Sequence, residues 1–230
     1  MKKTISFSLY GSASLYMDGA VRCVEHGRAK YPDWEWRFYI GDSVPAKTTA
    51  ALRDEGCQLV FMKGVPENYL STFWRFYACE DSDVMISRDA DSVILWREFH
   101  AVNEWLGSNR ILHTMRDHRH HAIPILAGMW GVKGRIENIR SQIESFPKKN
   151  RKGIEQTFLT KRIWPVFRDQ SIAHVGHRRC ILYGDRVTTN GHRIKFINPN
   201  QAIELDFPTA RIDTEHVGQV APPESHNIYY

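Results

Sequence analysis

Short apolar runs alternate with longer amphipathic stretches along the first part of the chain. Four of the runs have the length of buried strands: Thr4–Tyr10, Trp36–Ile40, Gln58–Met62 and Val84–Ile86. Between them lie three stretches with apolar residues at helical spacing: Ser12–Tyr31, Pro45–Glu55 and Ser71–Cys79. This alternation predicts an α/β fold with a mostly parallel central sheet and helices on both of its faces.

The pattern is less regular after the fourth strand. It predicts helices over Arg97–Leu106, Arg135–Phe146 and Ile154–Ile163, the last stopping before Pro165, and strands over Arg110–Met115 and Ile123–Trp130. Further on, only short strands such as Arg179–Tyr183 and Arg193–Ile197 stand out. We expect one catalytic domain over residues 1–205 and an irregular tail over residues 206–230, since the last stretch has no periodicity.

Composition narrows the class of protein. The 230 residues, 42% hydrophobic and 25% charged, suit one globular domain with a substantial core. No stretch approaches the roughly 20 apolar residues that a membrane span requires, and the apolar N-terminal run is too interrupted by serine for a signal peptide. Four scattered cysteines, without a C-x-x-C pair, are typical of reduced thiols in a cytoplasmic protein.

The net charge of +5 is concentrated between Gly131 and Lys195. Its densest part is the cluster of Lys148, Lys149, Arg151 and Lys152. Such a cluster could attract a polyanion or an anionic sugar nucleotide. We interpret it instead as a solvated loop, so no nucleic-acid partner is expected.

Asp89 and Asp91 follow directly after the fourth predicted strand, in the sequence S-R-D-A-D-S. Ligands of α/β sheets bind at such strand ends. Two carboxylates separated by one small residue repel each other unless a divalent cation with oxygen ligands joins them, and that cation can also bind phosphate oxygens. The alternative is structural, with Asp91 capping the next helix and Asp89 paired with Arg88.

Several histidines surround Arg116 and Asp117: His113, His118, His120 and His121. The last three lie too close in sequence to form a closed zinc site on their own. We interpret the stretch as a polar cleft wall. There Arg116 could bind a carboxylate or phosphate, and Asp117 could accept a hydroxyl proton.

Three further positions each allow a functional and a structural interpretation. The glycines of A-G-M-W-G, residues 127–131, could allow a ligand to approach beside the Trp130 indole, or could form a bulge with a core tryptophan. Arg75 could reach phosphates or lie buried. Glu155, at a predicted helix start, could be a catalytic base or could simply complement the helix dipole.

In this order, the strand S-F-S-L-Y-G, the helix F-W-R-F, R-D-A-D-S, M-R-D-H and A-G-M-W-G resemble a family of small GT-A glycosyltransferases found in bacteria and large algal viruses. The resemblance covers about Lys3–Ile163. It implies a GT-A (Rossmann-like) fold and a nucleoside-diphosphate-sugar donor, with UDP as the expected nucleotide. It further implies Mn²⁺ or Mg²⁺ as the cofactor and a glycan hydroxyl as the acceptor.

Carried over by this resemblance, Asp91 is the direct metal ligand and Asp89 contacts both ribose and metal. The donor would contact Ser8, Leu9, Tyr10, Gly11, Arg75, Arg88 and Ala90, while Arg116, His118, Gly128, Met129 and Trp130 would bind sugar substrates. A third metal ligand would be His174 or His177, and the sequence does not choose between them.

The helix start at Glu155 resembles the acidic position that faces the acceptor in related GT-A enzymes, although Asp is expected there. We predict Glu155 as the catalytic base and Asp117 as an anchor of the acceptor hydroxyl, because a charge partner would keep Asp117 a poor base. Inversion and retention of the sugar's configuration both stay open. The alternatives to a glycosyltransferase are a metal-dependent phosphohydrolase or nuclease, and a non-catalytic nucleic-acid-binding module that would not need the Asp pair.

Overall fold

The computed structural model describes residues 1–118, 121, 123–147, 149–176, 203–205, 207–208 and 217–218. Within this part of the chain, eight strands form one sheet in the order β3-β2-β1-β4-β6-β5-β7-β8. The strands are β1 (Lys3–Leu9), β2 (Glu35–Ile40), β3 (Gln58–Phe61), β4 (Val84–Arg88), β5 (Leu112–Arg116), β6 (Met129–Lys133), β7 (Ser171–Val175) and β8 (Ile203–Leu205). Strand β6 is antiparallel to both of its neighbours, and the other pairs are parallel.

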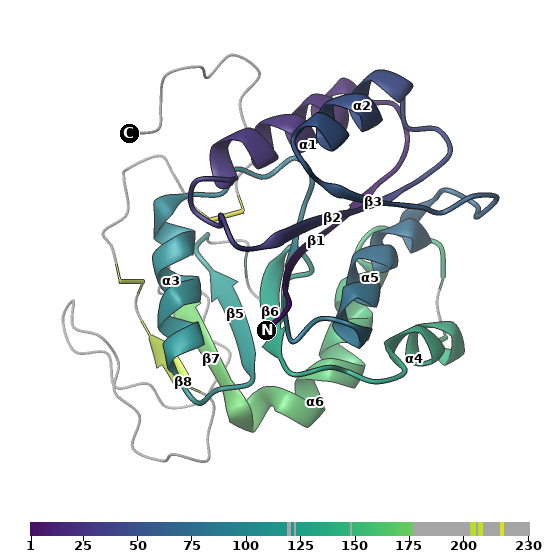
Figure 1. Ribbon diagram of the computed structural model, residues 1–230. Coiled ribbons are helices and arrows are strands. Elements are labelled where there is room, and N and C mark those ends of the chain that lie inside the picture. Colours follow the sequence, from purple (N-terminus) through teal and green to yellow (C-terminus); the bar gives the residue numbers. More distant parts are fainter. Residues whose placement is uncertain are drawn as a thin grey trace.

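Helices cover both faces of this sheet (Figure 1). The apolar residues of α1 (Ser14–Gly27), α2 (Ala46–Asp54) and α3 (Trp96–Gly107) join one core cluster. Those of the 3-10 helix η1 (Tyr69–Glu80), α4 (Ile139–Ser145) and α5 (Ile154–Phe158) join the other. The predicted fold class, a mostly parallel sheet flanked by helices, is therefore confirmed.

Strand β1 shows how the sequence produces the two layers. Its residues Ile5, Phe7 and Leu9 enter the first cluster, because alternate side chains of a strand point to the same face. Ser6 points to the other face, where its hydroxyl donates a 2.7 Å hydrogen bond to the carbonyl of Arg75 in η1. The serines that interrupt this apolar run therefore anchor η1 to the sheet.

Two predicted element boundaries are wrong. The strand predicted over Ile123–Trp130 begins only at Met129, because Pro124 has no backbone N–H for a central sheet position. The helix predicted to stop before Pro165 continues as the π-helix η2 (Leu159–Ile163) and then as α6 (Trp164–Phe167). Pro165 lies in the first turn of α6, directly after the π-helix.

The end of the described chain adds to the sheet. Strand β7, which the sequence pattern did not predict, pairs with β5, and β8 pairs with β7. Phe207 and Val217, both from the tail predicted to be irregular, are buried against Met129 and Met115. The short helix η3 (Arg168–Gln170) precedes β7. The strands predicted over residues 179–183 and 193–197 lie outside the described residues. No helix in the described part of the chain is long and apolar enough to cross a membrane.

Candidate functional site

A cavity of about 500 Å³ opens at the carboxyl ends of β1 and β4, the central parallel strands of the sheet. Parallel strands place ligands at this edge, and the volume lies in the range of small-ligand sites. We call it the donor cavity, after the sugar-nucleotide donor that the sequence predicts for these residues. Its wall includes ten residues that the sequence predicted for the site: Ser8, Leu9, Tyr10, Arg75, Asp89, Ala90, Asp91, Gly128, Met129 and Glu155.

Asp89 and Asp91 face the donor cavity from the loop after β4. The structural alternative for this pair does not hold. The N-cap of α3 is Leu95, without a side-chain cap, and Asp89 pairs with Arg75 rather than Arg88. Burial, and after it the charge of Asp89, raise the pKa of Asp91 above its usual value. Burial and the neighbouring carboxylate thus make the ionised form of Asp91 costly in the protein alone.

Arg75 and Gly128 fix the position of Asp89. The Arg75 guanidinium pairs with the Asp89 carboxylate and also donates to the Arg88 carbonyl at 3.0 Å. On the other side, a Cβ at Gly128 would lie 2.0 Å from Asp89 Oδ2, so only glycine leaves room for the carboxylate. The glycine in A-G-M-W-G is therefore explained by close approach of a protein side chain.

Glu155 lies in the first turn of α5 and is 7% exposed. Its Oε2 is buried and has no hydrogen-bond partner among the described residues. Tyr10 lies close by: burial raises its pKa most, and the charge of Glu155 raises it further. A buried carboxylate oxygen without a partner costs free energy, so a site retains it where a ligand or a proton uses it.

Several predicted site residues do not line the donor cavity: Gly11, Arg88, Arg116, Asp117, His118, Trp130 and His174. Arg88 is buried and forms an ion pair with Glu98, 2.5 Å away. Trp130 is fully buried and packs edge-on against Phe76, so its core interpretation is the correct one. Gly11 instead donates its backbone N–H to Glu67, 3.0 Å away.

Arg116 and Asp117 are instead bound by other groups of the protein. Arg116 is fully buried and donates to the carbonyl of Pro124 at 3.0 Å. Asp117 is buried and binds Arg97 through both oxygens, at 2.9 and 3.1 Å. Asp117 thus has a charge partner, as the sequence predicted, and this partner is Arg97. His118 contacts the ring of His121, which does line the cavity.

His174 is fully buried on β7, where its Nδ1 lies 2.8 Å from His113 Nε2 and its Nε2 lies 3.2 Å from Glu104. This arrangement does not bring it to the Asp pair, because β7 lies beyond β6 and β5 in the sheet. The described residues contain no group of three or more His, Cys, Asp and Glu placed to hold a metal. The alternative metal ligand His177 lies outside the described residues, as does His120 of the histidine-rich stretch.

Sequence reasoning missed part of the wall. Tyr16 and Tyr69, 45% and 48% exposed, line the donor cavity from α1 and η1, and Thr72 lies beside Tyr69. The available signal was an aromatic residue in the first turn of each of these two helices. Lys152 also lines the cavity and lowers the pKa of Asp91, although burial outweighs it. The basic cluster is therefore not one solvated loop.

The sequence matches no protein-family model, and no curated protein matches it. Among solved structures it is similar to a mycobacterial protein at 13% identity and a TM-score of 0.49, over 74% of this chain and 63% of the other. It is also similar to a glycosyltransferase involved in the glycosylation of the major capsid of PBCV-1, at 13% identity and a TM-score of 0.48, over 76% and 82%. A third match is glucosyl-3-phosphoglycerate synthase of M. tuberculosis, at 12% identity and a TM-score of 0.47, over 91% of this chain and 72% of the other.

At these identities a likeness concerns the fold alone. The chain spans less than two thirds of the length of the mycobacterial protein. The predicted fold class is confirmed through the sheet itself: four parallel strands lead to the Asp89–Asp91 loop, and one antiparallel strand follows beside them. Which donor, acceptor and metal the protein binds depends on the residues of the site.

Proposed function

We propose that this protein transfers a sugar from a nucleoside-diphosphate sugar, with UDP as the expected nucleotide, to a hydroxyl of a glycan acceptor. The observation that carries the proposal is the pair Asp89 and Asp91 at the end of β4, facing a cavity of about 500 Å³. Two carboxylates, one with a raised pKa, suit a divalent cation with oxygen ligands. When bound, Mn²⁺ or Mg²⁺ would neutralise the leaving diphosphate.

The chain's own residues would hold the reactants in place. Asp89 and Asp91 would hold the cation, and Arg75 positions Asp89 while presenting a guanidinium to the cavity. The exposed rings of Tyr16 and Tyr69 offer apolar faces for a base or a sugar. Gly128 keeps the space beside Asp89 free of side-chain atoms.

Glu155 is our proposal for the catalytic base of an inverting transfer. The acceptor oxygen would form a bond to the anomeric carbon as the bond from that carbon to the diphosphate oxygen breaks, and the hydroxyl proton would pass to Glu155. Its buried, unpartnered Oε2 on the cavity wall supports this role.

A reducing, cytoplasmic location also belongs to the proposal, since Cys23, Cys57 and Cys79 are buried free thiols.

Calorimetric titration of UDP with and without Mn²⁺ tests the proposal, with Asp91→Asn as the variant and the exposed Asp33→Asn as its control. Wild type and Asp33→Asn should bind UDP only with the metal, and Asp91→Asn should lose about tenfold or more in affinity, or about 1.4 kcal/mol. Unchanged affinity in Asp91→Asn would refute the metal site. Release of phosphate from nucleotides without an acceptor would favour the phosphohydrolase.

Stability without metal provides a second measurement on the same variant. Because the folded-state pKa of Asp91 is raised, the native state resists its ionisation, and stability falls as pH rises through the unfolded pKa toward the folded one. Asp91→Asn should therefore melt at a higher temperature than wild type without metal, and should gain less stability when Mn²⁺ and UDP are added.

A further inference from the structure

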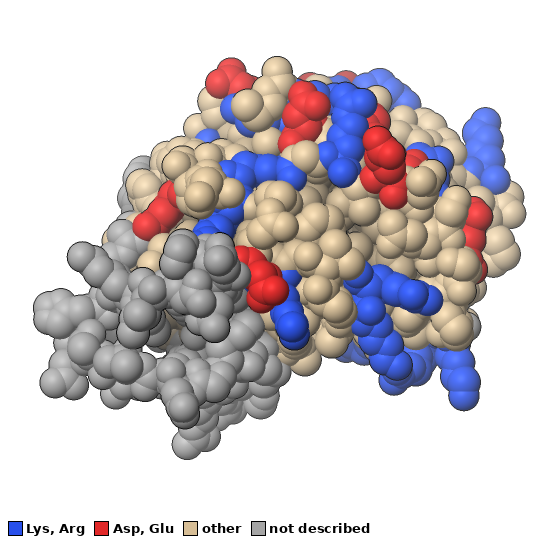
Figure 2. Space-filling model, turned by 90° about the horizontal axis from the view of Figure 1, so that it is seen from below, with Lys and Arg blue, Asp and Glu red and all other residues tan. Residues whose placement is uncertain are grey.

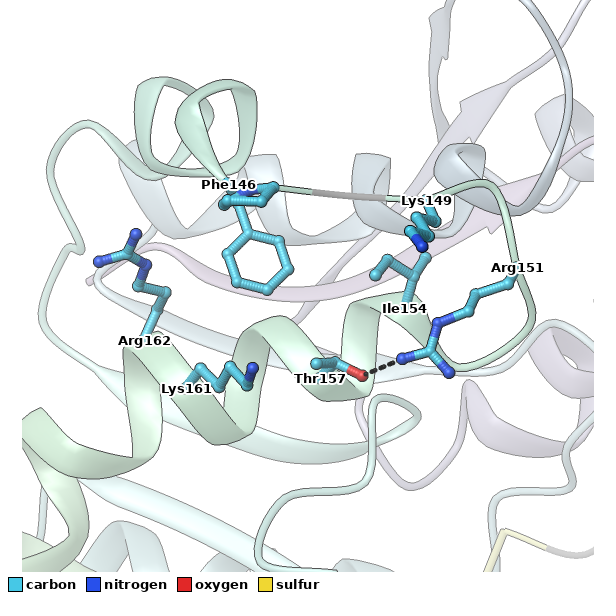
Figure 3. Close-up of a pocket in the computed structure, with 8 residues that line it drawn as sticks. Phe146, Lys149, Arg151, Ile154, Thr157, Lys161 and Arg162 are labelled. Atoms are coloured by element: carbon cyan, nitrogen blue, oxygen red, sulfur yellow. Dashed lines mark hydrogen bonds between the residues drawn. The ribbon is translucent and has the colours of Figure 1, made fainter.

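A second concave region, of about 840 Å³, shares helix α5 with the donor cavity. We call it the basic groove. Figure 3 shows it between the loop after α4 and the continuous helix formed by α5 and η2, with Lys149 and Arg151 on the loop and Lys161 and Arg162 on the helix. Within α5, Glu155 and Gln156 face the donor cavity, while Ile154 and Thr157 line the groove.

The basic groove carries positive charge without a compensating carboxylate. Its four cationic side chains, Lys149, Arg151, Lys161 and Arg162, are exposed, and no Asp or Glu is among its lining residues. None of the four forms an ion pair with another described residue, and Arg151 only donates to the Thr157 hydroxyl at 3.4 Å. On the face seen from below, Lys and Arg side chains likewise gather at one edge (Figure 2). Such a concave cationic surface attracts anions.

The helix that supplies two of these cations is itself unusual. Lys161 and Arg162 lie in η2, a π-helix whose Leu159 and Ile163 are buried in the core. π-Helices are rare and occur frequently at functional sites. In η2, Leu159 and Ile163 lie in the core, while both cations lie on the groove. The irregular geometry and the charge thus coincide in one segment.

We propose that the basic groove binds the anionic part of the acceptor, a glycan that carries phosphate or carboxylate groups. This inference rests on the proposed function. Arg151 and Ile154 line the groove, whereas the intervening Lys152 and Gly153 line the donor cavity. An acceptor held in the groove can therefore extend across this short stretch and bring a hydroxyl to Glu155.

A nucleic acid suits the groove less well than a glycan. Single-stranded nucleic acids bind on exposed aromatic rings on which bases stack. The aromatic residue of the groove, Phe146, is only 7% exposed, and its ring packs against Phe158 with the Arg162 guanidinium over it. The described lining thus offers cations and a hydroxyl, which suit anionic sugars, and lacks a free stacking platform.

The test uses the full chain in EDTA, so that no metal binds at the Asp pair. A fluorescent heparin hexasaccharide is the anionic glycan probe. The variant Lys149→Glu/Lys161→Glu is compared with Lys47→Glu/Arg53→Glu, which reverses two exposed cations of α2. Wild type and the α2 variant should bind the probe with salt-dependent affinity, and the groove variant should bind about tenfold or more weakly. Neutral maltohexaose should not bind.

Three outcomes would overturn the inference: probe binding by the groove variant as tight as by wild type, an equal loss in the α2 variant, or tighter binding of a single-stranded oligonucleotide of equal charge. A parallel titration with UDP and Mn²⁺ separates this inference from the proposed function. The groove variant should bind UDP like wild type. Absence of UDP binding in every protein would refute the transferase while the glycan result for the groove remained.

Discussion

Glu155 and Asp117 are both buried carboxylates, but their surroundings differ. Glu155 faces the donor cavity with an unpartnered oxygen, whereas Asp117 binds Arg97 through both oxygens and accepts the backbone N–H of Val217 at 3.1 Å. A fully bonded carboxylate between packed elements holds structure together. Asp117 is therefore a structural residue in our interpretation rather than the acceptor anchor that the sequence predicted.

Kinetics and stability of Glu155→Gln and Asp117→Asn distinguish these roles. Glu155→Gln should lower turnover about 10²–10⁴-fold, the range of a lost general base, with UDP affinity unchanged. Asp117→Asn should instead destabilise the fold by about 3–5 kcal/mol, because it breaks the buried ion pair that Asp117 forms with Arg97 through both oxygens. Urea unfolding and steady-state kinetics measure the two effects. Near-normal turnover in Glu155→Gln would reject the assignment.

For single residues, the sequence predicts which side chains can carry chemistry better than it predicts which side chains are buried. Asp89 and Asp91 could be predicted because their spacing is local and they follow an apolar run. The burial of Trp130 and His174 could not, because it depends on which strands pair. Trp130 lies opposite Ser87 and Thr114 only after β6 has entered between β4 and β5. Such long-range pairing leaves no local pattern.

At the scale of secondary-structure elements, the turn that leads into β6 helps to position the site. This turn places Gly128 against the Asp89 carboxylate, and the hydroxyl of Ser87 on β4 donates to the Ala127 carbonyl at 2.7 Å. The parallel half of the sheet could be predicted, since its strands and helices alternate with distinct periods. The start of β6 could not, because Ile125 and Ala127 are buried in the core without belonging to a strand.

Gly128→Ala tests the role of this turn. The added Cβ would overlap Asp89 Oδ2, so the carboxylate must move, and metal-dependent UDP affinity should fall about tenfold or more, or about 1.4 kcal/mol. Gly107→Ala is the matched control, because a Cβ there meets no atom within 4 Å. Calorimetry with Mn²⁺ measures both variants. Equal UDP affinities in the two would show that Asp89 tolerates displacement.

At the scale of the whole molecule, one buried histidine makes the free energy of unfolding depend on pH. His113 on β5 is fully buried, stacks on Trp105 at 5.1 Å and contacts His174. Burial, with smaller contributions from His174, Arg88 and Lys133, holds its pKa well below the usual value of 6.5. His113 is thus neutral in the folded protein and takes up a proton on unfolding in acid.

His113→Gln should weaken the pH dependence of stability. Below the unfolded pKa of about 6.5, wild type should lose about 1.4 kcal/mol per pH unit through this group, because only the unfolded state binds the proton. The variant should lose that slope whatever its stability at pH 7, while His100→Gln, at an exposed position, should keep it. Urea unfolding at several pH values measures the slopes, and equal slopes in all three proteins would contradict the prediction.

The place of β6 between β4 and β5 has a consequence for synthesis on the ribosome. Strands β1 to β4 emerge first and can already pair as neighbours, but β5 must wait for β6, which is made after it. Until then the nascent chain exposes the edge of β4, and open edges recruit other strands. The edge of β4 thus stays open to pairing with another chain until β6 has been made.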